Sequence, residues 1–131
     1  MIVLDTHVIV WNALQPERLS QKAKKIIARA NQEDGILFCD ISLWEIAMLI
    51  HKKRVVVDTT YAEFIHLLLA SNKYILKRIT PEIAELSTTF PATVSKDLAD
   101  RIISATSVIE HAQLVTADVN LRKASMLETL W

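Results

Sequence analysis

The sequence predicts an α/β protein, a three-layer α/β/α sandwich with a central, mostly parallel sheet. Short runs of β-forming residues alternate with longer amphipathic runs along the chain, and strands that are joined through helices form parallel sheets covered on both faces. The 131 residues, 51% of them hydrophobic and only one of them glycine, are expected to form a single domain over residues 1–131.

The predicted strands are five short apolar runs. They are too short for helices, and they are rich in the aliphatic residues that buried strands favour. They cover residues 2–4, 36–39, 74–79 and 114–116, with residues 127–131 as a possible last strand.

Helices are predicted where apolar residues recur at helical spacing. In the second of them Ala23, Ile26 and Ile27 share one face, while Lys22 and Lys25 lie outside. Another begins at Thr80, because threonine caps helices and the following Pro81 suits the first helical position. The remaining helices are expected at 43–53, 61–70, 98–111 and 119–124, and the first two at 8–14 and 20–31.

Composition excludes several classes of protein. No apolar run reaches the roughly 18 residues of a membrane span, and no secretory leader is apparent at the N-terminus. The lone Cys39 excludes an internal disulfide framework, so a cytoplasmic location is expected. Fifteen basic and fifteen acidic residues cancel, and any binding of nucleic acid must therefore use local patches or metal ions.

Four acidic residues stand just after a predicted strand or in the first turn of the next helix. Asp5 and Asp118 follow their strands, whereas Glu45 and Asp100 begin helices. Carboxyl ends of parallel strands meet at one edge of the sheet, where ligands bind. Helix capping is an alternative for the last three of these acids: Ser42 and Glu45 fit a capping box, Asp97 and Asp118 fit N-caps, and Asp100 falls in a first turn.

Asp5 is harder to explain as a cap, because it lies between apolar segments with no Lys or Arg within ten residues. An unpaired buried carboxylate is costly, and several carboxylates together repel unless they are protonated or bridged by cations. An all-oxygen set without a Cys or His pair suits Mg²⁺ or Mn²⁺. Such ions activate water and hold phosphodiesters, which is nuclease chemistry.

Three segments carry a resemblance to a known family: "IVLDTHVIVW", "SLWEIAMLIHKKRV" and "DLADRIISATSVIEHAQLVTAD". Together they resemble PIN-domain ribonucleases, specifically the VapC-type toxins of type II toxin–antitoxin systems. The resemblance implies that Asp5, Glu45, Asp100 and Asp118 form the catalytic Mg²⁺ or Mn²⁺ site, with Asp5 and Asp100 as the direct ligands. It also implies supporting residues, which are Thr6, Asp97, Arg101 and Thr116. Leu98 stands where relatives often carry proline.

The resemblance further implies partners. These are an RNA substrate, a VapB-like antitoxin that blocks the acidic pocket, a toxin homodimer and a higher hetero-oligomer with the antitoxin, with DNA contacted only through the antitoxin. Local candidates for RNA contacts are the basic residues 51–54, the cluster Lys22, Lys24 and Lys25, and the tryptophans Trp11, Trp44 and Trp131. Trp44, which lies in an apolar helix, is more often a core residue in such a helix, and no catalytic role is expected for the four scattered histidines.

Alternatives from other classes remain open. A phosphoacceptor receiver domain also gathers acids around Mg²⁺, but it needs an acid pair at the end of the first strand, where this sequence has Asp5 alone. A dehalogenase-type phosphatase would place a second acid two residues after Asp5, where His7 stands. A catalytically inactive binding module of the same fold is the remaining alternative. The presence of all four acids argues against it.

Overall fold

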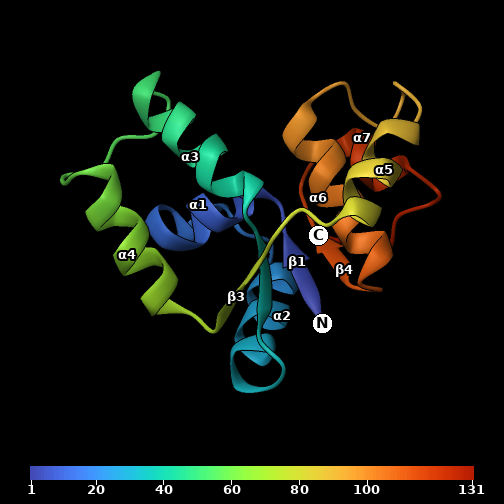
Figure 1. Ribbon diagram of the computed structural model, residues 1–131. Helices are drawn as coiled ribbons and strands as arrows, with labels where there is room; N and C mark the ends of the chain where they lie inside the picture. Colours follow the sequence, from blue (N-terminus) through green and yellow to red (C-terminus); the bar gives the residue numbers. More distant parts are fainter.

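The computed structural model describes residues 1–131 and contains one five-stranded sheet in which every pairing is parallel (Figure 1). The order of the strands is β3-β2-β1-β4-β5. Their bounds are Ile2–Leu4 (β1), Ile36–Cys39 (β2), Tyr74–Lys77 (β3), Gln113–Val115 (β4) and Thr129–Leu130 (β5). The predicted α/β class and the parallel sheet are confirmed, although three strands are shorter or shifted relative to the prediction.

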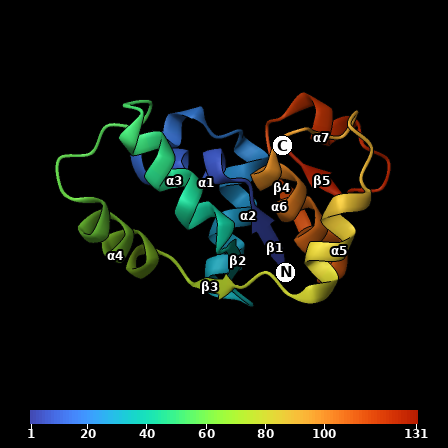
Figure 2. The ribbon, with the colours of Figure 1, turned by 45° about the horizontal axis from the view of Figure 1, so that its top comes forward.

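Seven α-helices and one 3₁₀ turn connect the strands (Figure 2). Their bounds are Thr6–Leu14 (α1), Gln21–Gln32 (α2), Ile41–His51 (α3), Tyr61–Ser71 (α4), Pro81–Thr89 (α5), Leu98–Ile109 (α6) and Val119–Lys123 (α7), and the 3₁₀ turn at Pro16–Arg18 was not predicted. None of the helices has both the length and the apolar character that crossing a membrane requires.

Two apolar cores cover the two faces of the sheet. Because side chains alternate along a strand, Ile2 and Leu4 face one core and Val3 faces the other. The first core is packed mainly by α1–α4, and the second mainly by α5 and α6, which lie on the other side of the sheet in Figure 1. The predicted three-layer architecture is therefore confirmed.

The sheet has a topological switch point at β1. The chain leaves β1 toward β2 on one side, and β4 later pairs with the other side of β1. Ligands of open parallel sheets bind outside the carboxyl ends of strands at such a point. Receiver domains have the order 2-1-3-4-5, whereas this sheet has 3-2-1-4-5, so the receiver alternative does not fit the fold.

The start of α3 differs from the prediction in a way that affects the site. Asp40, not Ser42, occupies the N-cap position, and Ser42 lies buried inside the helix. The capping box of Ser42 and Glu45 is therefore wrong, and Glu45 is free of a capping role. In contrast, the side chains of Thr80, Asp97 and Asp118 cap their helices as expected, and Thr60 caps α4 in the same way.

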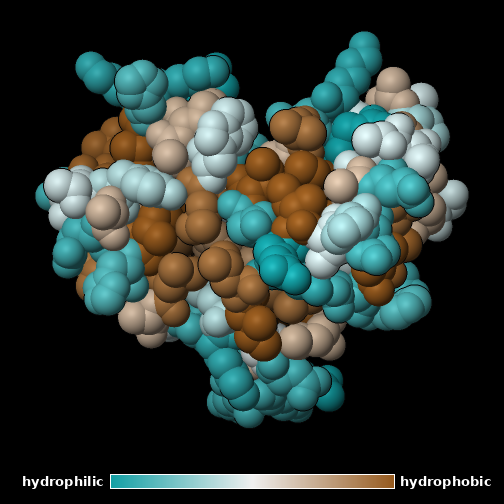
Figure 3. All heavy atoms as spheres, in the orientation of Figure 1, coloured by the Kyte–Doolittle hydropathy of each residue, from teal (hydrophilic) through white to brown (hydrophobic).

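Large apolar side chains remain on the surface at several helices. Trp44 is 57% exposed, so its expected core position is wrong, and Leu67 is 55% exposed. Figure 3 shows hydrophobic surface spread over this face of the molecule, broken by hydrophilic groups. The apolar side chains of α3 and α4 are therefore only partly buried in the core.

Candidate functional site

A pocket of about 360 Å³ lies at the carboxyl edge of the sheet, beside the switch point. It is lined by residues that follow β1, belong to α3, begin α6 or follow β4: Asp5, His7, Val8, Trp11, Glu45, Asp97, Asp100, Ala117 and Asp118. Five of these nine residues are acidic, and none is Lys or Arg. All four predicted catalytic acids, which are separated by up to 113 positions in the sequence (118 − 5), meet in this pocket.

Asp5 is anchored at the end of β1. Its backbone N–H donates to the Val115 carbonyl oxygen, which continues the pairing of β1 with β4. Its side chain is only 6% exposed, and its Oδ2 accepts a hydrogen bond of 2.7 Å from the Thr116 hydroxyl. The side-chain hydrogen-bond partner of this carboxylate is thus a hydroxyl group, and no Lys or Arg side chain forms an ion pair with it.

Thr116 also connects Asp5 to Asp118. The Thr116 Oγ1 that donates to Asp5 accepts the Asp118 backbone N–H at 3.1 Å. Asp118 Oδ1 in turn accepts the N–H of Leu121 at the start of α7, so one carboxylate oxygen caps the helix. Capping and pocket lining are therefore compatible for Asp118, and Thr116 fixes two of the acids relative to one another.

The start of α6 positions Asp100. Asp97 caps this helix by accepting the Asp100 backbone N–H at 3.0 Å. Ser95 donates to Asp100 Oδ2 at 3.0 Å, and the same hydroxyl accepts the Asp97 N–H. Sequence reasoning missed Ser95, because a serine in a loop has no distinctive spacing from the acid that it contacts.

Glu45 has an unsatisfied atom. Its side chain is 6% exposed, and its Oε1 is buried without a hydrogen-bond partner in the chain. Nearby, the Thr6 and Ser42 hydroxyl groups bond to one another at 2.8 Å and thereby join α1 to α3. A buried carboxylate oxygen without a partner is uncommon in folded proteins and indicates a missing ligand, ion or water.

Three carboxyl groups of the pocket, those of Asp5, Glu45 and Asp100, have raised pKa values. Burial first, and then the charges of Asp5 and Asp97, raise the pKa of Asp100 to about 7. Burial likewise raises the pKa of Asp5, with a smaller contribution from Asp118, and raises that of Glu45, with smaller contributions from Asp97 and Asp5. At neutral pH the pocket favours a bound cation or protons, because either relieves this repulsion.

A divalent cation fits the donor set of the pocket, although the carboxylates do not form a complete cage. The donors are all oxygen, one of them is unpartnered, and hard cations such as Mg²⁺ prefer this chemistry. No three carboxyl, imidazole or thiol groups stand close enough together to ligate one ion directly. Mg²⁺ usually keeps several waters and takes only one or two protein carboxylates, so such a cage is not required.

Of the four predicted supporting residues only Asp97 lines the pocket, whereas Thr6, Arg101 and Thr116 do not line the pocket. Thr6 is fully buried behind it and bonds to Ser42. Arg101 points toward backbone carbonyl groups: it donates to Ser87 at 2.9 Å, to Ser95 at 2.7 Å and also to Phe90. Arg101 therefore holds the segment that carries Ser95 and does not face the pocket itself.

His7 lines the pocket, although no role was expected for it. It stands one helical turn before Trp11, with the two rings 6.1 Å apart. Its position after Asp5 in "DTH" places it at the first turn of α1, next to the acids. The sequence signal that could have identified His7 as a pocket residue is its position two residues after Asp5, and not its spacing to another histidine.

The strand order and the acidic pocket at the switch point together define a class, the doubly wound α/β proteins whose pocket is suited to a divalent cation. Residues 2–126 match the PIN domain family, and the chain belongs to that family. A relative, Ribonuclease VapC22 of Mycobacterium tuberculosis, is 31% identical over 121 residues, which cover 92% of this chain and 89% of that protein. The family expected from the sequence is thus confirmed.

Solved structures share the fold across nearly the whole chain. The VapBC2 structure from Rickettsia felis, bound to a promoter DNA fragment, has a TM-score of 0.73 at 15% identity and covers 99% of this chain and 98% of that one. A toxin–antitoxin complex from Klebsiella pneumoniae has a TM-score of 0.67 at 16% identity, with 100% and 97% covered. At these identities the likeness establishes the fold.

Proposed function

We propose that the protein is a metal-dependent endoribonuclease toxin that cleaves cellular RNA, inhibits growth and is neutralised by a cognate antitoxin. The observation that carries the proposal is the buried, unpartnered Glu45 Oε1 in a pocket where Asp5 and Asp100 also have raised pKa values. The relationship to a protein named a ribonuclease, and to chains found in toxin–antitoxin complexes, supports the substrate and the partner.

In this proposal Asp5 and Asp100 hold a Mg²⁺ or Mn²⁺ ion, and Glu45 and Asp118 complete the site. When bound, the ion would offset the negative charge of the phosphodiester and lower the pKa of a coordinated water. Thr116 fixes the orientation of the Asp5 carboxyl group by donating to its Oδ2, and Ser95 does the same for Asp100. Glu45 Oε1 is free to accept a proton or a hydrogen bond from a water held there.

The first expected result is metal-dependent cleavage. The purified protein should cut single-stranded RNA internally when Mg²⁺ or Mn²⁺ is added, and excess EDTA should stop the reaction, because the acids alone cannot offset the charge of the phosphate. Mapping of 5′ ends on defined RNA is the measurement. Cleavage that persists in EDTA would contradict the dependence on a metal ion. Absence of cleavage of any RNA with either ion would favour the inactive binding module.

The second expected result concerns pH and stability without metal. The Asp100 pKa is raised from 3.8 to about 7, so its protonated form favours the folded state. That contribution is present below pH 4 and is lost as the pH rises toward 7. The melting temperature of EDTA-treated protein should therefore fall over this range, and Asp100→Asn should flatten the fall. Added Mg²⁺ should stabilise the parent more at pH 8 than at pH 5, because it competes with protons. An equal gain in melting temperature at both pH values would contradict binding of Mg²⁺ at the carboxyl groups of the pocket.

The proposal also includes the assembly. An antitoxin partner is proposed from the same relatives, whereas the homodimer, the higher hetero-oligomer and DNA contact only through the antitoxin are proposed from the family resemblance. Exposed apolar side chains, among them Trp44 and Leu67, are available for such interfaces. Light scattering of the purified chain, alone and with its antitoxin, is the measurement.

A further inference from the structure

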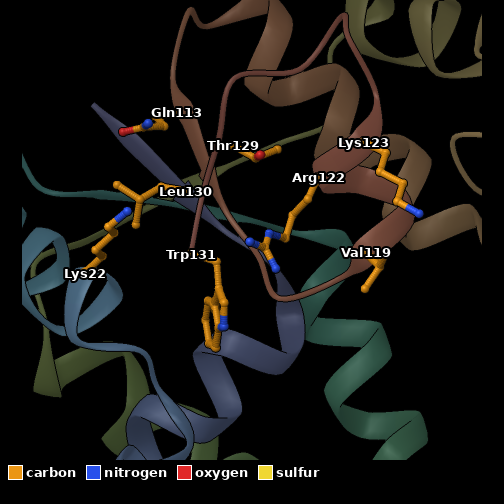
Figure 4. Close-up of a pocket in the computed structure, with 8 residues that line it drawn as sticks. All are labelled: Lys22, Gln113, Val119, Arg122, Lys123, Thr129, Leu130 and Trp131. Carbon is orange, nitrogen blue, oxygen red and sulfur yellow. The ribbon is translucent and has the colours of Figure 1, made fainter.

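A second hollow, of about 640 Å³, has a charge opposite to that of the acidic pocket, and its lining residues are drawn in Figure 4. It lies between α2, α7 and the end of the chain at β5. Three of its lining side chains are cationic, namely Lys22, Arg122 and Lys123, and no acidic side chain lines it. We refer to this hollow as the basic cleft.

The cations of the basic cleft have no partners within the chain. The only ion pairs join Arg29 to Glu33 and Lys77 to Glu110, and no side-chain hydrogen bond involves a cation of the cleft. Arg122 and Lys123 lie in the last turn of α7, where positive charges complement the helix dipole. That explanation does not apply to Lys22, which lies in the first turn of α2. Figure 4 shows Lys22 beside Leu130 on one side of the cleft and Arg122 beside Trp131 on the other, with Lys123 extended outward.

An aromatic pair joins the basic cleft to the acidic pocket. Trp131 lines the cleft, Trp11 lines the pocket, and their ring centroids are 5.9 Å apart. The guanidinium of Arg18 lies 4.4 Å from the centre of the Trp11 ring. On the other side Asp118 of the pocket is followed directly by Val119 of the cleft. The two hollows are therefore adjacent, and one extended ligand can occupy both.

We infer that the basic cleft binds the sugar–phosphate backbone of single-stranded RNA next to the bond that the acidic pocket cuts. This inference rests on the proposed function. The protein has no net charge, and the acidic pocket itself repels a polyanion, so binding energy for RNA must come from a local patch. The cleft supplies unpaired cations for phosphates, and the half-buried Trp131 supplies an indole ring for a base.

The test compares two double variants that each remove two positive charges from exposed positions. Arg122→Gln with Lys123→Gln changes the basic cleft, whereas Lys73→Gln with Arg78→Gln changes the surface at β3, at the far edge of the sheet. Binding of a fluorescent 12-nucleotide RNA is followed by anisotropy in EDTA, which removes the metal that the proposed cleavage needs. The cleft variant should bind about 10-fold more weakly at 0.1 M salt, with a salt dependence lower by about 1.4 in log–log slope, and the β3 variant should bind like the parent.

Cleavage separates this inference from the proposed function. With metal, the cleft variant should cut the 12-nucleotide RNA with a raised KM but should cut a dinucleotide, which is too short to reach the cleft, at the parental rate. If the parent cleaves neither substrate, the proposed function fails, while the anisotropy still tests the cleft. Equal RNA binding by parent and cleft variant overturns the inference. Loss of antitoxin binding with RNA binding intact also overturns it and assigns the cleft to an acidic protein segment instead.

Discussion

Replacement of Asp5 by asparagine is expected to lower metal-dependent RNA cleavage by about 10³-fold, the equivalent of about 4 kcal/mol of transition-state stabilisation lost with a metal ligand. Asparagine has the same shape, and its Oδ1 can still accept the hydrogen bond from Thr116. Because burial penalises the Asp5 charge, the neutral variant should be at least as stable as the metal-free parent at pH 7.

Thermal unfolding and single-turnover cleavage of a defined RNA are the two measurements. Asp58→Asn is the matched control, since Asp58 is exposed and does not line the pocket. Mg²⁺ should raise the melting temperature of the parent and of the control but should have little effect on Asp5→Asn. Cleavage by Asp5→Asn at the parental rate would remove Asp5 from the site and, with it, the metal assignment.

The positions of the acids were predictable because strand ends were predictable. β1 and β4 are short runs of aliphatic residues, and a parallel sheet brings their carboxyl ends together whatever lies between them. Asp5 and Asp118 were therefore placed at one edge from local pattern alone. Glu45 and Asp100 were grouped with them because each lies near the start of a predicted helix, and the structure brings both to the same edge on α3 and α6. The family resemblance then assigned all four acids to one metal site.

The contacts that hold the acids were not predictable in the same way. Thr116 and Asp5 are 111 residues apart, and Ser42 and Thr6 are 36 apart. Hydroxyl groups at such separations leave no periodic signal, because their partners depend on tertiary packing. Ser42 illustrates why local pattern alone failed here: its spacing to Glu45 fits a capping box, but α3 begins two residues earlier than that pattern predicts. Ser42 therefore contacts α1, and Glu45 faces the pocket.

Arg101 illustrates the same limit from the other direction. The family pattern grouped it with the site, whereas its guanidinium binds three carbonyl groups, those of Ser87, Phe90 and Ser95. Ser95 then contacts Asp100 through its hydroxyl. Arg101 therefore holds the segment between α5 and α6, and this segment holds Asp100 through Ser95.

Arg101→Met should therefore destabilise the protein. Methionine retains much of the apolar stem but leaves three carbonyl groups without their charged donor, which should lower the free energy of unfolding by about 3 kcal/mol. For a chain of 131 residues this corresponds to a melting temperature lower by about 10 °C. The measurement is urea unfolding together with a thermal scan, and Arg78→Met, at an exposed arginine, is the control.

Activity distinguishes this positioning role from direct catalysis. At 20 °C, where folded Arg101→Met still predominates, cleavage should fall about 10-fold, because Ser95 no longer holds Asp100 firmly, and this loss is far smaller than that of Asp5→Asn. The gain in melting temperature on Mg²⁺ addition should persist, since Arg101 does not line the pocket. A variant with parental stability and a 10³-fold loss of cleavage would instead place the guanidinium in contact with substrate, and the carbonyl contacts would then be incidental.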